Sequence, residues 1–130
     1  MARIKVIEYH EATGRLKEVY DDLVKKRGKL ADVHKIQSLR PESIVAHMDL
    51  YMEIMFSKSE LSRAEREMMA VVVSVANGCE YCQMHHAQAL NHYWKNDEKI
   101  SRLRTDFEAA DLTKRELVLC SFANLLTVNP

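Results

Sequence analysis

The chain has 130 residues, of which 47% are hydrophobic, and its 19 Lys and Arg residues balance 19 Asp and Glu residues at zero formal net charge. This length suits one domain with a real core but not two, so we expect a single domain over residues 1–130. Without a basic stripe, neither a nucleic acid nor an anionic membrane is an expected partner. Balanced charge also permits self-association.

Glycine and proline are scarce, with three and two copies, and long stretches without either favour helices over strands. The N-terminus has no apolar run of signal-peptide length, and the longest apolar run, residues 68–73, is far too short to span a membrane. We therefore expect a cytoplasmic protein. In that compartment, a CxxC pair is more often redox-active or metal-binding than a structural disulfide.

The first half of the chain predicts two amphipathic helices. Residues 1–10 read as extended, and apolar residues then recur at helical spacing over 11–26, where Gly28 is placed to end the helix. Residues 31–40 could form a short helix or a turn, and Pro41 fits the first turn of a helix that reaches residue 56. The stripe of this second helix favours a core or a subunit interface over a cofactor site. It consists of Ile44, Val45, Met48, Tyr51, Met52 and Met55.

A helix with clear end signals follows. Ser62 and Glu65 form a capping box, and Asn77-Gly78 is a helix terminator. Three consecutive valines could indicate a strand, but these end signals favour a buried helix. Glu67 lies within it. Periodicity alone leaves two alternatives, a surface carboxylate in the first turns or a buried carboxylate that needs a proton-exchanging partner.

The next helix, over residues 79–94, carries two of the three cysteines. Cys79, Cys82 and His86 are spaced i, i+3 and i+7, which places them on one face, and His85 is three residues from Cys82. Both sulfurs are expected in the first helical turn. Unpaired backbone N–H groups and the helix dipole stabilise a thiolate there and lower the pKa of a cysteine.

The last third of the chain predicts two more helices. One covers residues 98–107, and the other follows a second capping box, Thr113 to Glu116. Cys120 lies in the apolar run of the final helix and reads as an inert buried thiol. The expected architecture is all-α, with about six helices.

Two kinds of chemistry suit the cysteine pair. A structural zinc site needs four ligands, and Cys79, Cys82 and a histidine supply three. The fourth would have to come from Glu67, His92 or another subunit. No second CxxC or HxxxH exists, and Gln83 after the second cysteine excludes a covalent haem motif, so we expect no metal and no cofactor.

Dithiol redox chemistry fits the pair better. A thiolate can attack a peroxide oxygen and become a sulfenic acid, which a neighbouring thiol converts to a disulfide. The cycle needs one activated thiolate, one resolving thiol, a proton donor for the leaving alkoxide, and an external dithiol reductant.

The spacing Glu67, eleven residues, Cys79-x-x-Cys82, three residues, His86 resembles the AhpD-like alkylhydroperoxidases of the carboxymuconolactone decarboxylase superfamily. Residues 61–67 and 77–82 are similar to its peroxidase-related branch, and the resemblance extends over about residues 40–95. It implies an AhpD-like helical fold with the CxxC at the start of a central helix, and a homo-oligomer. It further implies that Cys82 is the peroxidatic thiol, that Cys79 resolves it, and that Glu67 and His86 move protons.

The sequence departs from the family pattern at two points. Tyr81 stands between the cysteines where well-characterised members have a histidine, so His85 could support the relay instead. The branch also usually continues for another helical segment beyond Pro130.

The sequence therefore predicts a cysteine-based peroxidase that reduces organic hydroperoxides in antioxidant defence, recharged by a small-molecule or protein-borne dithiol. The alternatives are a general dithiol–disulfide oxidoreductase or redox sensor without efficient peroxidase activity, and a non-redox binding or assembly protein with vestigial cysteines.

Overall fold

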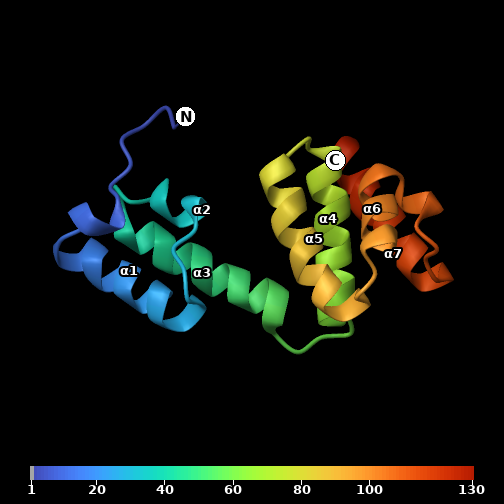
Figure 1. Cartoon of the computed structure of the whole chain (residues 1–130), viewed down its shortest axis with the longest axis horizontal. Coiled ribbons are helices and arrows are strands. Elements are labelled where there is room, and N and C mark those ends of the chain that lie inside the picture. The colour runs from blue at the N-terminus through green and yellow to red at the C-terminus, as the bar shows by residue number, and fades with distance from the viewer. Residues whose placement is uncertain (1) are drawn as a thin grey trace. The chain divides into compact units, whose positions relative to one another are not determined.

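The computed structural model describes residues 2–130, which form helices and no strands (Figure 1). In chain order the elements are η1 (Tyr9–Glu11), α1 (Gly14–Arg27), α2 (Asp32–Lys35), α3 (Pro41–Phe56), α4 (Arg63–Ala76), α5 (Glu80–Trp94), α6 (Asp97–Thr105), η2 (Phe107–Ala109) and α7 (Lys114–Val128). The predicted all-α class is confirmed, and α2 is a single turn beside six longer helices.

The chain divides into two compact units, one up to Ser57 and one from Lys58 to Pro130. The single domain expected from length stays a prediction.

The first unit is built on α1 and α3. Gly28 ends α1 in the left-handed conformation, with φ of 75°, as its position in the sequence predicts. The fully buried Tyr20 donates its hydroxyl to the carbonyl of Ile7 at 3.0 Å, and the amide of Ile7 donates to the hydroxyl of Ser38 at 2.9 Å. These two bonds hold the extended N-terminal segment against α1 and the turn that follows α2.

Two expectations for the first unit need correction. The helix predicted from residue 11 begins at Gly14, because Tyr9–Glu11 form a 3₁₀ turn and Thr13 takes the N-cap position. The apolar stripe of α3 is not uniformly buried: Ile44 and Met55 are buried, while Met52 is 45% exposed. Periodicity shows which face of a helix is apolar, but not how much of that face its neighbours cover.

The second unit packs α4 against α5 and α7 (Figure 1). Its core joins side chains from four helices, namely Met68, Val71 and Val72 of α4, Leu90 of α5, Leu103 of α6, and Cys120 of α7. Both predicted capping boxes are confirmed, at Ser62–Glu65 and at Thr113–Glu116. The helix predicted over 98–107 ends earlier, at Thr105. There the extended Asp106 caps the separate turn η2 with its side chain.

Cys120 is a buried free thiol, as the sequence predicts. Burial among apolar side chains raises the pKa of its thiol to about 12. At physiological pH this sulfur is a neutral packing group, so the thiol chemistry of the chain rests on Cys79 and Cys82.

The first unit contains a buried histidine. His34 is 5% exposed, and its Nδ1 accepts the backbone N–H of Ala31 at 3.3 Å. Its ring meets the ring of His47 edge to face, with centroids 6.5 Å apart. Burial lowers the pKa of His34 below its ordinary value of 6.5, and the nearby positive charges of Arg27 and His47 lower it further.

This lowered pKa predicts an acid-sensitive contribution to stability. As the pH falls below about 6.5, the unfolded chain protonates His34 while the folded chain resists, so the free energy of unfolding decreases. The free energy of unfolding falls by at most about 1.4 kcal/mol per pH unit, and it stops falling once the folded state also binds the proton. Urea unfolding of His34→Asn, which keeps an acceptor for Ala31, should lack this contribution. His10→Asn, at an exposed position, should retain it. Identical pH profiles for the unmodified protein and both variants would contradict the prediction.

Candidate active site

The candidate site begins at the corner between α4 and α5. Gly78 adopts the left-handed conformation, with φ of 63°, which lets the chain reverse directly after α4. The amide of Gly78 donates to the carbonyl of Val75, and the amide of Cys79 donates to the carbonyl of Ser74, both at 2.9 Å. These bonds close the end of α4 and place Cys79 at the N-cap of α5.

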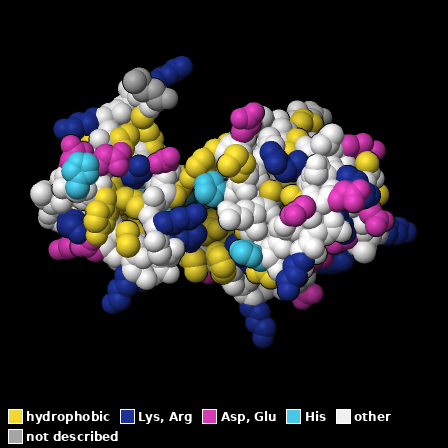
Figure 2. All heavy atoms as spheres, in the orientation of Figure 1, with side chains coloured by type: hydrophobic (Ala, Val, Ile, Leu, Met, Phe, Trp, Pro, Cys, Tyr) yellow, Lys and Arg dark blue, Asp and Glu magenta, His cyan; other side chains and the backbone are white. Residues whose placement is uncertain are grey.

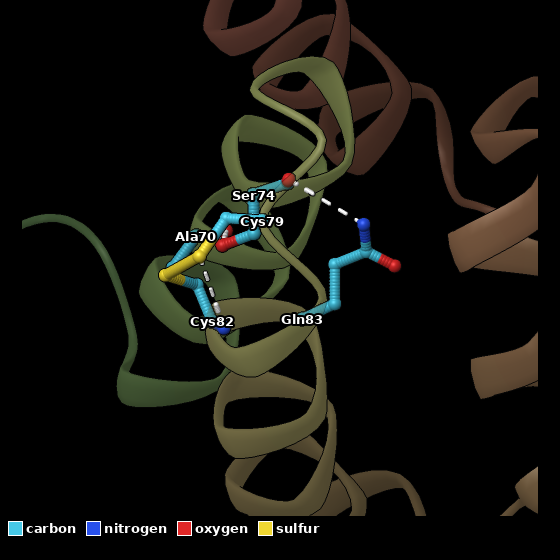
Figure 3. Close-up of a disulfide and its surroundings, with 5 residues drawn as sticks. All are labelled: Ala70, Ser74, Cys79, Cys82 and Gln83. Atoms are coloured by element: carbon cyan, nitrogen blue, oxygen red, sulfur yellow. Dashed lines mark hydrogen bonds between the residues drawn. A yellow bond between two sulfur atoms is a disulfide. The ribbon is translucent and has the colours of Figure 1, made fainter. Parts of the chain in front are cut away.

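Cys79 and Cys82 form a disulfide whose Cα atoms are 5.4 Å apart (Figure 3). The sulfur of Cys79 accepts the backbone N–H of Cys82 at 3.3 Å, so it fills the place that a serine or aspartate oxygen occupies at other helix starts. Both sulfurs therefore lie in the first turn of α5, as predicted. A thiolate formed there by reduction gains from the same N–H group and from the helix dipole.

Gln83 follows the second cysteine but points away from the disulfide (Figure 3). Its amide donates to the carbonyl of Ser74 at 3.5 Å and accepts from Arg104 of α6 at 3.4 Å. It thus ties the start of α5 to the neighbouring helices. No signal in the sequence indicates this role beyond a polar residue in a partly buried helix.

The second part of the site joins α4 to α5. Glu67 is 1% exposed, and its Oε2 lies 2.6 Å from Nδ1 of His86. Of the two alternatives that periodicity left open, Glu67 is therefore the buried carboxylate with a partner that can exchange a proton. His86 is four residues after Cys82 on α5, so the two side chains are neighbours on one face of the helix.

The other oxygen of Glu67 forms an ion pair with Arg63, one turn earlier on α4. Sequence reasoning missed this residue. The spacing of i and i+4 between a basic and an acidic residue is a detectable signal, but on most helices such pairs are exposed and have no function. The burial of Glu67, which the i, i+4 spacing does not reveal, makes this pair different.

His85 and Tyr81 are arranged differently from the other candidates. Their rings contact each other edge to face, with centroids 4.3 Å apart, and Tyr81 is 42% exposed. The structure therefore brings Glu67 and His86 together and pairs Tyr81 with His85 one turn apart on α5. A part for either in proton transfer stays a prediction.

Within residues 2–130, no group of three or more His, Cys, Asp and Glu side chains is arranged to hold a metal ion. Over the same part of the chain, no helix combines the length and the apolar character that crossing a membrane requires.

The arrangement combines three chemical functions. Two cysteines that can interconvert between dithiol and disulfide lie at a helix start. A histidine lies one turn further along the same helix, and a buried carboxylate fixes its Nδ1. An imidazole held in this way can accept a proton from a thiol and return it to a leaving group.

Comparison with known proteins gives the family. Residues 41–124 match the carboxymuconolactone decarboxylase family, a segment that includes Glu67, both site cysteines and His86. No curated protein matches the chain significantly.

Two solved structures share the fold. One, from Ralstonia eutropha, is an alkylhydroperoxidase AhpD core described as an uncharacterized peroxidase-related protein. It is 24% identical with a TM-score of 0.83, and the match covers 98% of this chain and 67% of that one. The other, an uncharacterized peroxidase-related protein from a Silicibacter species, is 27% identical with a TM-score of 0.81, over 99% and 71% of the two chains. The chain belongs to the carboxymuconolactone decarboxylase family and has the AhpD-like fold.

Proposed function

We propose that this protein is a thiol peroxidase that reduces organic hydroperoxides through a Cys79–Cys82 dithiol–disulfide cycle. The observation that carries the proposal is the buried Glu67–His86 pair, placed one turn along α5 from Cys82 of the disulfide. A structural disulfide would need no such pair. The peroxidase-related names of the two similar structures support the same reaction class.

In the first step, His86 takes the proton of the Cys82 thiol. The Cys82 thiolate attacks one peroxide oxygen, the O–O bond breaks, and a sulfur–oxygen bond forms. The departing alkoxide takes the proton from the His86 imidazolium and leaves as an alcohol, so that Cys82 becomes a sulfenic acid.

In the second step, Cys79 resolves the sulfenic acid. Its sulfur attacks the sulfur of Cys82 and forms the disulfide, while the hydroxide leaves with the Cys79 proton as water. The N-cap position of Cys79 eases the loss of that proton and so makes its sulfur a better nucleophile. An external dithiol, borne by a small molecule or a protein, then reduces the disulfide and becomes oxidised itself. The net role would be antioxidant defence.

A second candidate is a general dithiol–disulfide oxidoreductase or redox sensor. The N-cap position of Cys79 favours it, because an N-cap thiolate is also suited to attack a disulfide in another protein. The two candidates differ in which oxidant reacts faster with the reduced chain.

Stopped-flow oxidation of the reduced protein tests the proposal. Several organic hydroperoxides, hydrogen peroxide and a protein disulfide are compared at equal concentration. We expect an organic hydroperoxide to react fastest, and acid quenching followed by mass spectrometry to find a Cys79–Cys82 disulfide. Faster oxidation by the protein disulfide would favour the second candidate. If no peroxide oxidised the reduced protein faster than it oxidises an unactivated thiol, the proposed peroxidase function would be contradicted.

We also propose that copies of the chain associate. Five apolar side chains of α7 are each more than half exposed, namely Val118, Phe122, Leu125, Leu126 and Val128. Hydrophobic side chains are also visible at the surface in Figure 2. Zero net charge limits electrostatic repulsion between copies. Sedimentation velocity that found only single chains at micromolar concentration would contradict this proposal.

A further inference from the structure

The carboxylate of Glu67 has a different partner at each oxygen. Oε1 forms the ion pair with Arg63, and Oε2 lies 2.6 Å from Nδ1 of His86. The side chain is almost fully buried, so these neighbours rather than water satisfy its two oxygens. Arg63 comes from α4 and His86 from α5. Because both contact the same carboxylate, the charge of Arg63 affects where the ring of His86 carries its hydrogen.

The position of Arg63 is unusual for a basic residue. It is the first residue of α4, directly after the N-cap Ser62, where the helix dipole disfavours a positive charge. Its side chain is nevertheless 19% exposed and directed to Glu67 rather than into solvent. Helix stability does not account for an arginine here, whereas pairing with the buried carboxylate does.

We propose that Arg63 is a positioning residue that keeps Nε2 of His86 unprotonated and able to accept the proton of Cys82. A guanidinium stays charged at any physiological pH and so balances Glu67 as a carboxylate. An ionised carboxylate has no proton to give and only accepts hydrogen bonds, so Nδ1 of His86 must be the donor. A neutral imidazole carries one N–H, so its Nε2 is left with a free electron pair.

Removing the charge of Arg63 should place a hydrogen on Nε2 of His86. The buried pair of Glu67 and neutral His86 would then have a net negative charge, which favours the uptake of one proton. If that proton stays on Glu67, the carboxylic acid donates to Nδ1 and the imidazole hydrogen moves to Nε2. If it goes to the ring, the imidazolium has hydrogens on both nitrogens. Either result protonates Nε2.

This inference rests on the proposed function only in the claim that His86 accepts the proton of Cys82. The tautomer of His86 can be measured without turnover. Long-range ¹H–¹⁵N correlation spectra of the ¹⁵N-histidine-labelled protein distinguish protonated from unprotonated ring nitrogens. In the unmodified protein at mildly alkaline pH, we expect a hydrogen on Nδ1 of His86 and none on Nε2. A hydrogen on Nε2 under these conditions would overturn the proposal without any variant.

Three substitutions extend the test. In Arg63→Met we expect protonated Nε2 at the same pH and slower oxidation of Cys82 by a hydroperoxide. Arg63→Lys keeps the charge and should restore the bare Nε2. The matched control is Arg115→Gln, because Arg115 of α7 pairs with Glu65, which is two residues before Glu67 on α4. This substitution should leave the hydrogen of His86 on Nδ1 and its Nε2 unprotonated.

The outcomes separate the two proposals. A bare Nε2 in Arg63→Met, in protein whose circular dichroism and Cys79–Cys82 disulfide match the unmodified chain, would overturn the positioning role. The expected spectra in a protein that reacts with no hydroperoxide would sustain the role of Arg63 toward His86 and contradict the peroxidase function alone.

Discussion

Replacing Cys82 with serine should abolish the turnover of an organic hydroperoxide by the reduced protein. A serine hydroxyl is not ionised at neutral pH and cannot form the sulfenic acid, so the first step has no nucleophile. The backbone N–H of residue 82 that caps onto the Cys79 sulfur is retained, so α5 should still form. Consumption of hydroperoxide with an excess of dithiol reductant measures the loss.

Two further variants sharpen this result. Cys79→Ser should still consume about one equivalent of hydroperoxide and then stop at a Cys82 sulfenic acid, which a dimedone adduct detects by mass. Cys120→Ala should retain turnover, because that thiol is buried and its pKa is raised to about 12. Full activity of Cys82→Ser would show that the peroxide reacts elsewhere. Turnover that required Cys79 but not Cys82 would exchange the proposed roles of the two cysteines.

Replacing Glu67 with glutamine should affect both stability and rate. The substitution leaves Arg63 without its buried counter-charge, and removal of one partner of a buried ion pair costs on the order of 3–5 kcal/mol in the free energy of unfolding. It also removes the negative charge that orients His86, and the one amide oxygen of glutamine cannot serve both His86 and Arg63. Loss of a positioned acid–base group slows a reaction by about 10²–10⁴-fold, so we expect oxidation of Cys82 to slow within that range.

Urea unfolding and stopped-flow oxidation measure the two effects separately. Glu98→Gln is the control, because Glu98 pairs with Arg102 on the surface of α6 with 77% of its side chain exposed. That substitution should change the free energy of unfolding by less than about 1 kcal/mol and leave the rate unchanged. An unchanged oxidation rate in folded Glu67→Gln would remove Glu67 from the mechanism, whatever its effect on stability.

Local signals in the sequence predicted the parts of the fold that depend on neighbouring residues. The capping boxes at Ser62 and Thr113 and the terminators Gly28 and Asn77-Gly78 marked helix ends that the structure confirms. The spacing of Cys79 and Cys82 at a helix start predicted that the two sulfurs would lie together. Each of these features is decided within a few residues, where backbone geometry leaves few alternatives.

Features that depend on packing between helices were less predictable. Periodicity could not decide whether Glu67 is buried, and the family resemblance, rather than any local pattern, favoured the correct alternative. It also could not show that part of the α3 stripe is exposed. Arg63 was missed because its pairing with Glu67 matters only once α5 brings His86 to the other oxygen. The tie from Gln83 to α6 likewise depends on where Arg104 lies.

The sulfur cap at the start of α5 links secondary structure to redox state. A thiolate accepts the N–H of Cys82 more strongly than a disulfide sulfur does, because charge strengthens a hydrogen bond. Reduction should therefore tighten the first turn of α5, while oxidation loosens it. By thermodynamic reciprocity, whatever stabilises that turn in the reduced chain raises the reduction potential of the pair by the equivalent free energy. A reductant or partner that binds the first turn of α5 more tightly in the reduced chain would thus raise the reduction potential of the disulfide without contacting either sulfur.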